Sequence, residues 1–175
     1  MVATVLGCLG FFILIQTIFS PRADTDISHY YQIRNQYWSS KLIQHFPEIL
    51  PPEATNISMA YFSGFLQAGA YFQLRLKLSP HQIKNLQRRF DAIATHKYWG
   101  GDTNSHTNQQ DGVPTTFFYT NSLQDDHLFP ESYEILVLEA QPLGKQPEFI
   151  WNHGYSYGVA ISSSTSEIIY WVESW

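Results

Sequence analysis

The stretch AYFQLRLKLS, residues 70–79, alternates apolar and polar side chains. In an extended chain, successive side chains point to opposite sides, so this period of two predicts a β-strand. Four apolar side chains would form one face and three polar ones the other: Phe72, Leu74, Leu76 and Leu78 against Gln73, Arg75 and Lys77. A sheet with one dry side and one wet side is typically antiparallel. We therefore expect a mainly antiparallel sheet.

Other segments rich in β-branched and aromatic residues surround this strand, and they are expected to join its sheet. They are residues 56–64, 115–120, 132–140, 155–161 and 167–175. The last two are separated by SSSTS, residues 162–166, which predicts a hairpin between them.

Two segments have helical spacing. Ser79-Pro80-His81-Gln82 forms a capping box with proline at the first helical position, and apolar residues follow it at Ile83, Leu86, Phe90 and Ile93. Asp26 would cap an earlier helix over residues 27–46, with a stripe of Tyr30, Ile33, Tyr37 and Leu42, which Pro47 would end. Two or three helices grouped with strands, without regular β-α alternation, predict an α+β fold. We expect one such domain over residues 24–175.

The N-terminal residues 2–19, VATVLGCLGFFILIQTIF, contain no charged residue. As a helix they would extend about 27 Å, which is close to the thickness of the hydrocarbon core of a bilayer. Residues 1–23 are therefore predicted to be an uncleaved, single-pass membrane anchor or signal-anchor.

Two other interpretations remain for this segment. A cleaved signal peptide would need a basic start and an A-x-A-like site, and neither is present. A lipoprotein signal ending at Cys8 would have only seven residues before the cysteine. Arg22 would favour a cytoplasmic body by the positive-inside tendency, but we expect the body to lie outside the cytoplasm.

The overall composition excludes some classes of function. Hydrophobic residues make up 44% of the chain and charged residues 14%, so a substantial core can form. The net charge of −5 disfavours nucleic acid as a partner, because phosphate binding needs a concentrated basic surface. Neither a Walker nor a dinucleotide-binding glycine pattern occurs, so no cofactor is predicted.

Gly154-Tyr155-Ser156-Tyr157-Gly158 matches the G-x-S-x-G pattern of hydrolases. A nucleophile elbow needs a helix after the serine, and the acid and the histidine then follow in the sequence. The residues after Ser156 are typical of a strand, and no histidine occurs beyond His153. We therefore interpret Ser156 as a strand serine between close-packing glycines.

A long polar segment, residues 96–114, contains His96, Asp102, His106 and Asp111. Such side chains can bind zinc or a harder divalent ion. Their spacing fits no compact ligand motif, so we predict a hydrogen-bonding loop without a metal. The alternative is a small hydrolase or metal-dependent enzyme that uses residues 96–111 and His153.

Aromatic residues lie beside this loop and near the C-terminus. We predict binding residues among them and their neighbours at Tyr98, Trp99, Trp151, His153 and Tyr155. Exposed aromatic rings beside polar groups form platforms for sugars, peptides or proteins. The hypothesis favoured by the sequence is a non-catalytic, membrane-anchored binding domain whose partner is a protein or a polysaccharide.

Overall fold

A computed structural model describes residues 22–36, 40–64, 69–101, 106–121, 127–145 and 150–175. The predicted anchor, residues 2–19, lies outside these ranges. In the ranges described, no helix is long and apolar enough to cross a membrane.

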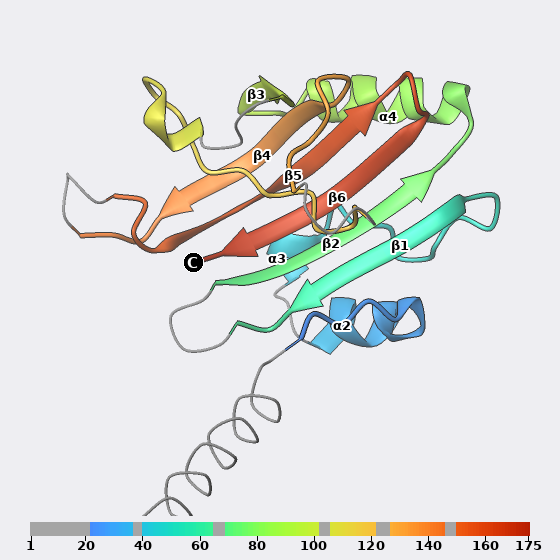
Figure 1. The fold of residues 1–175 in the computed structure, drawn as a ribbon, viewed down its shortest axis with the longest axis horizontal. Coiled ribbons are helices and arrows are strands. Elements are labelled where there is room, and N and C mark those ends of the chain that lie inside the picture. Colours follow the sequence, from blue (N-terminus) through green and yellow to red (C-terminus); the bar gives the residue numbers. More distant parts are fainter. Residues whose placement is uncertain (1–21, 37–39, 65–68, 102–105, 122–126, 146–149) are drawn as a thin grey trace, which may run out of the picture.

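Among the described residues, six strands form one antiparallel sheet in the order β1-β2-β6-β5-β4-β3 (Figure 1). They are β1 (Thr55–Phe62), β2 (Ala70–Lys77), β3 (His96–Trp99), β4 (Glu134–Pro142), β5 (Gly154–Ser162) and β6 (Glu167–Ser174). The helices are η1 (Ile27–His29), α2 (Tyr30–Gln36), α3 (Ser40–Ile43), α4 (Pro80–Asp91) and η2 (His106–Asn108). This confirms the predicted α+β class and the mainly antiparallel sheet.

The connections explain the strand order. After β2, helix α4 leads the chain to the far edge of the sheet, where β3 forms. The chain then returns through β4, β5 and β6, and β6 pairs with β2. The capping box that begins α4 is present as predicted: Ser79 and Gln82 bond each other's backbone N–H groups.

Helices α2, α3 and α4 pack on one face of the sheet, which we call the helix face. Residues Tyr30, Phe46, Ile83 and Phe90 contribute to a buried cluster there, together with strand residues such as Leu74. The predicted apolar side of β2 belongs to this core, since Phe72, Leu74, Leu76 and Leu78 are all buried.

The other face of the sheet, which we call the loop face, is covered too. Val113, Phe118, Phe129 and Tyr133 come from the segment between η2 and β4 and form a second core with strand residues that include Trp171. The prediction of a wet side on β2 is therefore wrong at Gln73, which is fully buried beneath this segment. Lys77, at the end of the strand, is exposed as expected.

Three other predicted boundaries differ from the structure. Residues 115–120 form no strand, because this segment lies across the loop face and its backbone bonds to the side chain of Gln73. His96–Trp99 is an edge strand and not part of a loop, since it pairs with β4. Helix α4 ends at Asp91, which leaves Ile93 exposed.

The expected helix over residues 27–46 is divided into η1, α2 and α3. Tyr30, Ile33 and Leu42 of its predicted stripe do pack against the helix-face core. Tyr37, the remaining member of the stripe, lies outside the described residues.

Candidate functional site

The predicted binding residues Tyr98 and Trp99 are neighbours on β3, so their side chains point to opposite faces of the sheet. Tyr98 packs against the loop-face core, and its hydroxyl accepts a hydrogen bond from the backbone N–H of Val113 at 3.1 Å. Trp99 is 63% exposed. The two rings cannot act on one ligand from the same side.

Trp151, His153 and Tyr155 lie around the start of β5. Trp151 is half-buried against Trp175, whose indole N–H donates to the Trp151 carbonyl at 2.5 Å. His153 is exposed. Tyr155 lies on the helix face, where its hydroxyl bonds the Glu139 carboxylate at 2.8 Å. The five predicted residues thus occupy two faces and two regions, and their role in binding stays a prediction.

The histidines of the enzyme hypothesis do not all meet. Tyr98 stacks on His106 at 3.9 Å between ring centroids, and on its own strand neighbour His96 at 6.4 Å. Tyr98 lies in the row of Ala160, whereas His153 precedes Gly154 at the other end of β5. Ala160 and Gly154 are six residues apart on β5, which corresponds to about 20 Å along the strand.

The described residues also give these histidines no metal-binding arrangement. No group of three or more His, Cys, Asp or Glu side chains placed to hold a metal ion occurs among the described residues. Asp102 lies outside them, and Asp111 is exposed. Burial lowers the pKa of His106, which favours the neutral ring in the stack.

Ser156 lies on β5 and is fully buried. The flanking glycines are required by packing, because a Cβ at Gly158 would lie 2.1 Å from the Leu136 carbonyl oxygen and one at Gly154 would lie 2.6 Å from that of Gln141. The interpretation as a strand serine between close-packing glycines is confirmed.

A group of residues that the sequence did not reveal lies around Glu173. In the sheet, Tyr71 of β2, Glu173 of β6 and Ser156 of β5 form one row. Tyr119 belongs to the residues that lie over the loop face, 113–121 and 127–133, which we call the covering segment. Its ring stacks flat on Tyr71 at 3.7 Å, and its hydroxyl donates a hydrogen bond to Glu173 Oε1 at 2.9 Å. The covering segment therefore closes over this carboxyl group.

Several polar atoms near Glu173 are buried without a partner. Glu173 Oε2, Ser156 Oγ and Trp171 Nε1 form no hydrogen bond within the part of the chain that the structure describes. Burial raises the pKa of Glu173 to about 7, although hydrogen bonds from Thr116 and Tyr119 act in the opposite direction. The carboxyl group can therefore be protonated near neutral pH, which distinguishes it from a surface glutamate.

The other end of β6 has a carboxylate with the opposite behaviour. Burial alone would raise the pKa of Glu167, but hydrogen bonds from Tyr133, Arg75 and Thr165 lower it overall. Arg75 reaches Glu167 Oε1 at 2.6 Å, and its guanidinium lies 5.2 Å from the centre of the Phe118 ring. Glu167 thus stays ionised and accepts a hydrogen bond from the hydroxyl of Tyr133 at 2.5 Å, while its ion pair with Arg75 lies within the sheet.

Gln73 holds the same segment through neutral hydrogen bonds. Its side-chain N–H donates to the Phe117 carbonyl at 2.8 Å, and its oxygen accepts from the backbone N–H and the hydroxyl of Thr120, both at 2.9 Å. Gln73 and Arg75 therefore act as attachment points for the segment above them.

Where the covering segment meets the edge of the sheet, four rings form a surface that we call the aromatic band: Phe62, Tyr71, Tyr119 and Phe117. Their centroids are separated by 5.7, 3.7 and 6.1 Å in that order. Phe117 is 47% exposed, and the other three are partly exposed. Sequence reasoning missed the band because it assigned these residues to three separate strands.

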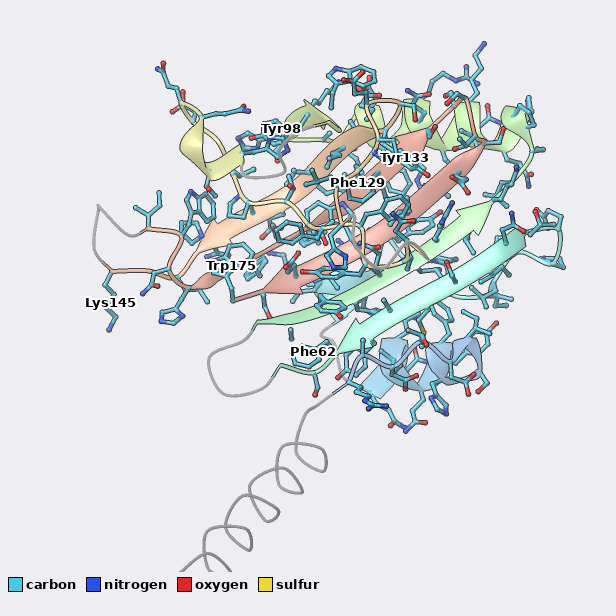
Figure 2. All side chains as sticks on the ribbon, viewed as in Figure 1. Phe62, Tyr98, Phe129, Tyr133, Lys145 and Trp175 are labelled. Atoms are coloured by element: carbon cyan, nitrogen blue, oxygen red, sulfur yellow. The ribbon has the colours of Figure 1, made fainter. Side chains whose placement is uncertain are left out.

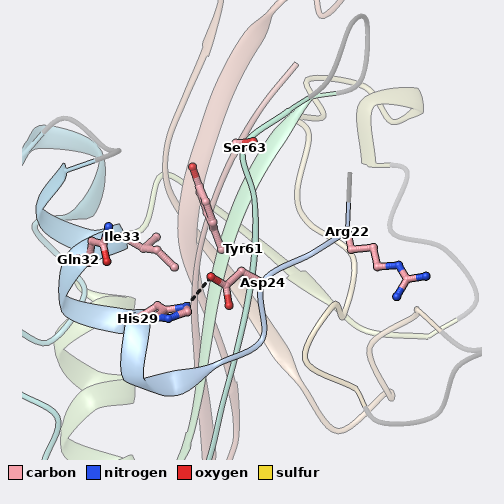
Figure 3. A pocket seen from close by; sticks show the side chains of 7 residues that line it. All are labelled: Arg22, Asp24, His29, Gln32, Ile33, Tyr61 and Ser63. Carbon is pink, nitrogen blue, oxygen red and sulfur yellow. Dashed lines mark hydrogen bonds and ion pairs between the residues drawn. The ribbon is translucent and has the colours of Figure 1, made fainter. Parts of the chain in front are cut away.

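An open cavity of about 350 Å³ lies where the described chain begins (Figure 3). Its most polar feature is an ion pair between His29 Nδ1 and Asp24 Oδ2 at 2.8 Å, and the hydrogen bond to Asp24 raises the pKa of His29. Figure 3 shows the Arg22 side chain directed away from this pair. The polar groups of this cavity are therefore better explained as a solvated surface ion pair than as a catalytic centre.

Comparison of this chain with protein-family models, with curated proteins and with solved structures gives no match.

Proposed function

We propose that the protein is a membrane-tethered, non-catalytic domain that binds a protein or polysaccharide partner outside the cytoplasm. Residues 2–19 would serve as the single-pass anchor, since an uncharged run of this length prefers hydrocarbon to water. The body would need no cofactor for this role.

The observation that carries the binding proposal is the aromatic band. Rings that combine apolar area with hydroxyl groups are favoured in recognition surfaces. Phe117 is exposed, whereas Phe118 and Phe129, which come from the same region of the chain, are buried. An aromatic side chain held at the surface by a backbone hydrogen bond to Gln73 can contact a partner without a large loss of conformational freedom.

The enzyme alternative receives less support. It requires at least two of His96, His106 and His153 to converge with a carboxylate. His96 and His106 both stack on Tyr98, whereas the register places His153 about 20 Å away along β5.

The proposal can be tested by replacing Phe117 with a photoreactive benzoyl-phenylalanine in the full-length chain, in its native host. We expect a discrete cross-linked species after illumination. Its loss on treatment with a polysaccharide-degrading enzyme would identify a polysaccharide partner, and its persistence would identify a protein partner. The matched control carries the same photoreactive residue at Ser163, an exposed position in the β5–β6 turn. Equal cross-linking from both positions, or none from position 117, would contradict the proposed role of the band.

A further inference from the structure

The chain enters the domain at one defined end of the sheet, which we call the chain-entry end. Asp24 forms a two-residue bridge with Tyr61, near the end of β1, through backbone hydrogen bonds of 2.7 and 2.8 Å. Strands β4 and β6 also end there, and β2 and β5 begin there. The first described residues therefore lie at this end of the sheet, beside the end of β1 (Figure 1).

Two aliphatic side chains are exposed at the same end. Leu143 and Ile150 belong to the connection between β4 and β5 and are 59% and 40% exposed. Figure 2 shows Phe62, Trp175 and Lys145, labelled, along this end of the molecule. Single exposed aliphatic residues are common on protein surfaces. These two matter because they lie at the same end of the sheet as the point where the chain enters the domain.

The base of this connection is held firmly. The backbone N–H of Leu143 donates to the His153 carbonyl at 2.7 Å, and Gly154 and Trp175 exchange two backbone hydrogen bonds of 3.0 and 3.1 Å. The indole of Trp175 is attached to the Trp151 carbonyl. The backbone beside Leu143 and Ile150 is therefore held by these hydrogen bonds and by the contact between the two tryptophans.

The chemistry of this end matches the interface of a bilayer. Tryptophan and tyrosine are enriched at the level of lipid headgroups, because their rings are apolar and their N–H or O–H groups are polar. Lys145 and Arg22 are exposed cations at this end, and such cations interact favourably with anionic headgroups. Four strand spacings separate β1, where the chain enters, from β4, which leads to Leu143. These two strands therefore lie about 19 Å apart.

We infer that the chain-entry end lies on the surface of the bilayer, with Leu143 and Ile150 inserted among the headgroups as a second contact beside the tether. The inference rests on the proposed membrane anchor. A single tether at the edge strand β1 would leave the body free to rotate, whereas a second contact at Leu143 and Ile150 fixes its orientation. The aromatic band then faces sideways along the membrane.

The test uses the full-length chain with Cys8→Ala, so that a single new cysteine can carry a fluorophore. Leu143→Cys is labelled and reconstituted into vesicles of phosphatidylcholine with a minor fraction of phosphatidylglycerol, and headgroup-level spin-labelled lipid is the quencher. The matched control is Ser163→Cys, ten residues further along the sheet and about 33 Å from the chain-entry end. We expect quenching to be several-fold stronger at position 143 than at position 163.

The experiment distinguishes failure of the membrane tether from failure of the second contact. Chain that floats with the vesicles but shows equal quenching at both positions would overturn the second contact and leave the tether intact. Chain that does not float with the vesicles would overturn both. Lys145→Glu in the labelled Leu143→Cys chain should reduce quenching in vesicles that contain phosphatidylglycerol and leave it unchanged in pure phosphatidylcholine. An equal change in both lipids would contradict the role of the anionic headgroup.

Discussion

The two faces of the sheet are both buried, but they are held by different interactions. On the helix face, apolar side chains from β2, β5 and β6 pack against α2, α4 and the residues after α3. On the loop face, an irregular segment is attached by polar side chains, chiefly Gln73, Glu167 and Glu173. The helix face is stabilised mainly by removal of apolar surface from water, and the loop face depends in addition on satisfied hydrogen bonds.

This contrast shows how to interpret a strand in which apolar and polar side chains alternate regularly. Apolar residues on alternate positions of β2 do identify a buried face. Polar residues on the remaining positions do not identify a solvent-exposed face, because a second layer can use them as attachment points. Gln73 and Arg75 are examples, since both bond residues more than forty positions away.

The largest expected effect tests the helix face. Leu74→Ala would remove a fully buried side chain from the core and should lower the free energy of unfolding by about 2–5 kcal/mol. Urea unfolding followed by circular dichroism would measure it. The same substitution at exposed Leu143 is the control and should change stability by less than about 0.5 kcal/mol. Similar losses at both positions would show that the helix face is not the principal core.

A smaller effect is expected on the loop face. Gln73→Leu keeps much of the volume but leaves the Phe117 carbonyl and the Thr120 N–H without their partner, which should cost about 1–3 kcal/mol. Amide hydrogen exchange should accelerate most in residues 113–121. Gln44→Leu, at an exposed position, is the control. If exchange accelerates equally throughout the sheet, the segment is not held locally by Gln73.

Features that depend on residues close together in the sequence could be predicted, whereas those that depend on distant residues could not. The capping box at Ser79 and the apolar positions of β2 are local patterns, and both were predicted correctly. TTFFYT, residues 115–120, has the composition of a strand, but tertiary contacts with Gln73 outweigh that propensity. No local pattern links Tyr119 to Glu173, which lies 54 residues further along the chain.

The candidate site was less predictable than the fold for the same reason. Tyr98 and Trp99 are adjacent in sequence and were grouped together, yet strand geometry sends them to opposite faces. Phe62, Phe117 and Tyr119 were treated as ordinary strand residues. Only the register between β1, β2 and β6, together with the path of the covering segment, brings the aromatic band together.

The smallest expected effect concerns pH. In the unfolded chain Glu173 would ionise near its ordinary pKa of 4.5, whereas in the folded protein its pKa is about 7. The folded state therefore holds the proton more tightly, and this group reduces stability progressively as the pH rises from about 4.5 to about 7. Glu173→Gln should raise the melting temperature at pH 8 by a few degrees, since about 1 kcal/mol corresponds to about 2–4 °C at this size.

At pH 4 the same substitution should have little effect, because the carboxyl group is protonated in both states. The control is Glu131→Gln, at an exposed position. A melting temperature of the Glu173→Gln variant that falls at pH 8 would show that the ionised carboxylate is a stabilising part of the loop face.

The most direct test of the proposed function concerns the attachment of the body to a membrane. Full-length chain made in its native host would be fractionated after cell lysis, and the membranes would be washed with alkaline carbonate. We expect the unprocessed chain to stay in the membrane fraction until detergent is added, and intact cells stripped of any outer barrier to expose the body to added protease. Recovery of the unprocessed chain in the soluble fraction without detergent would contradict a membrane tether.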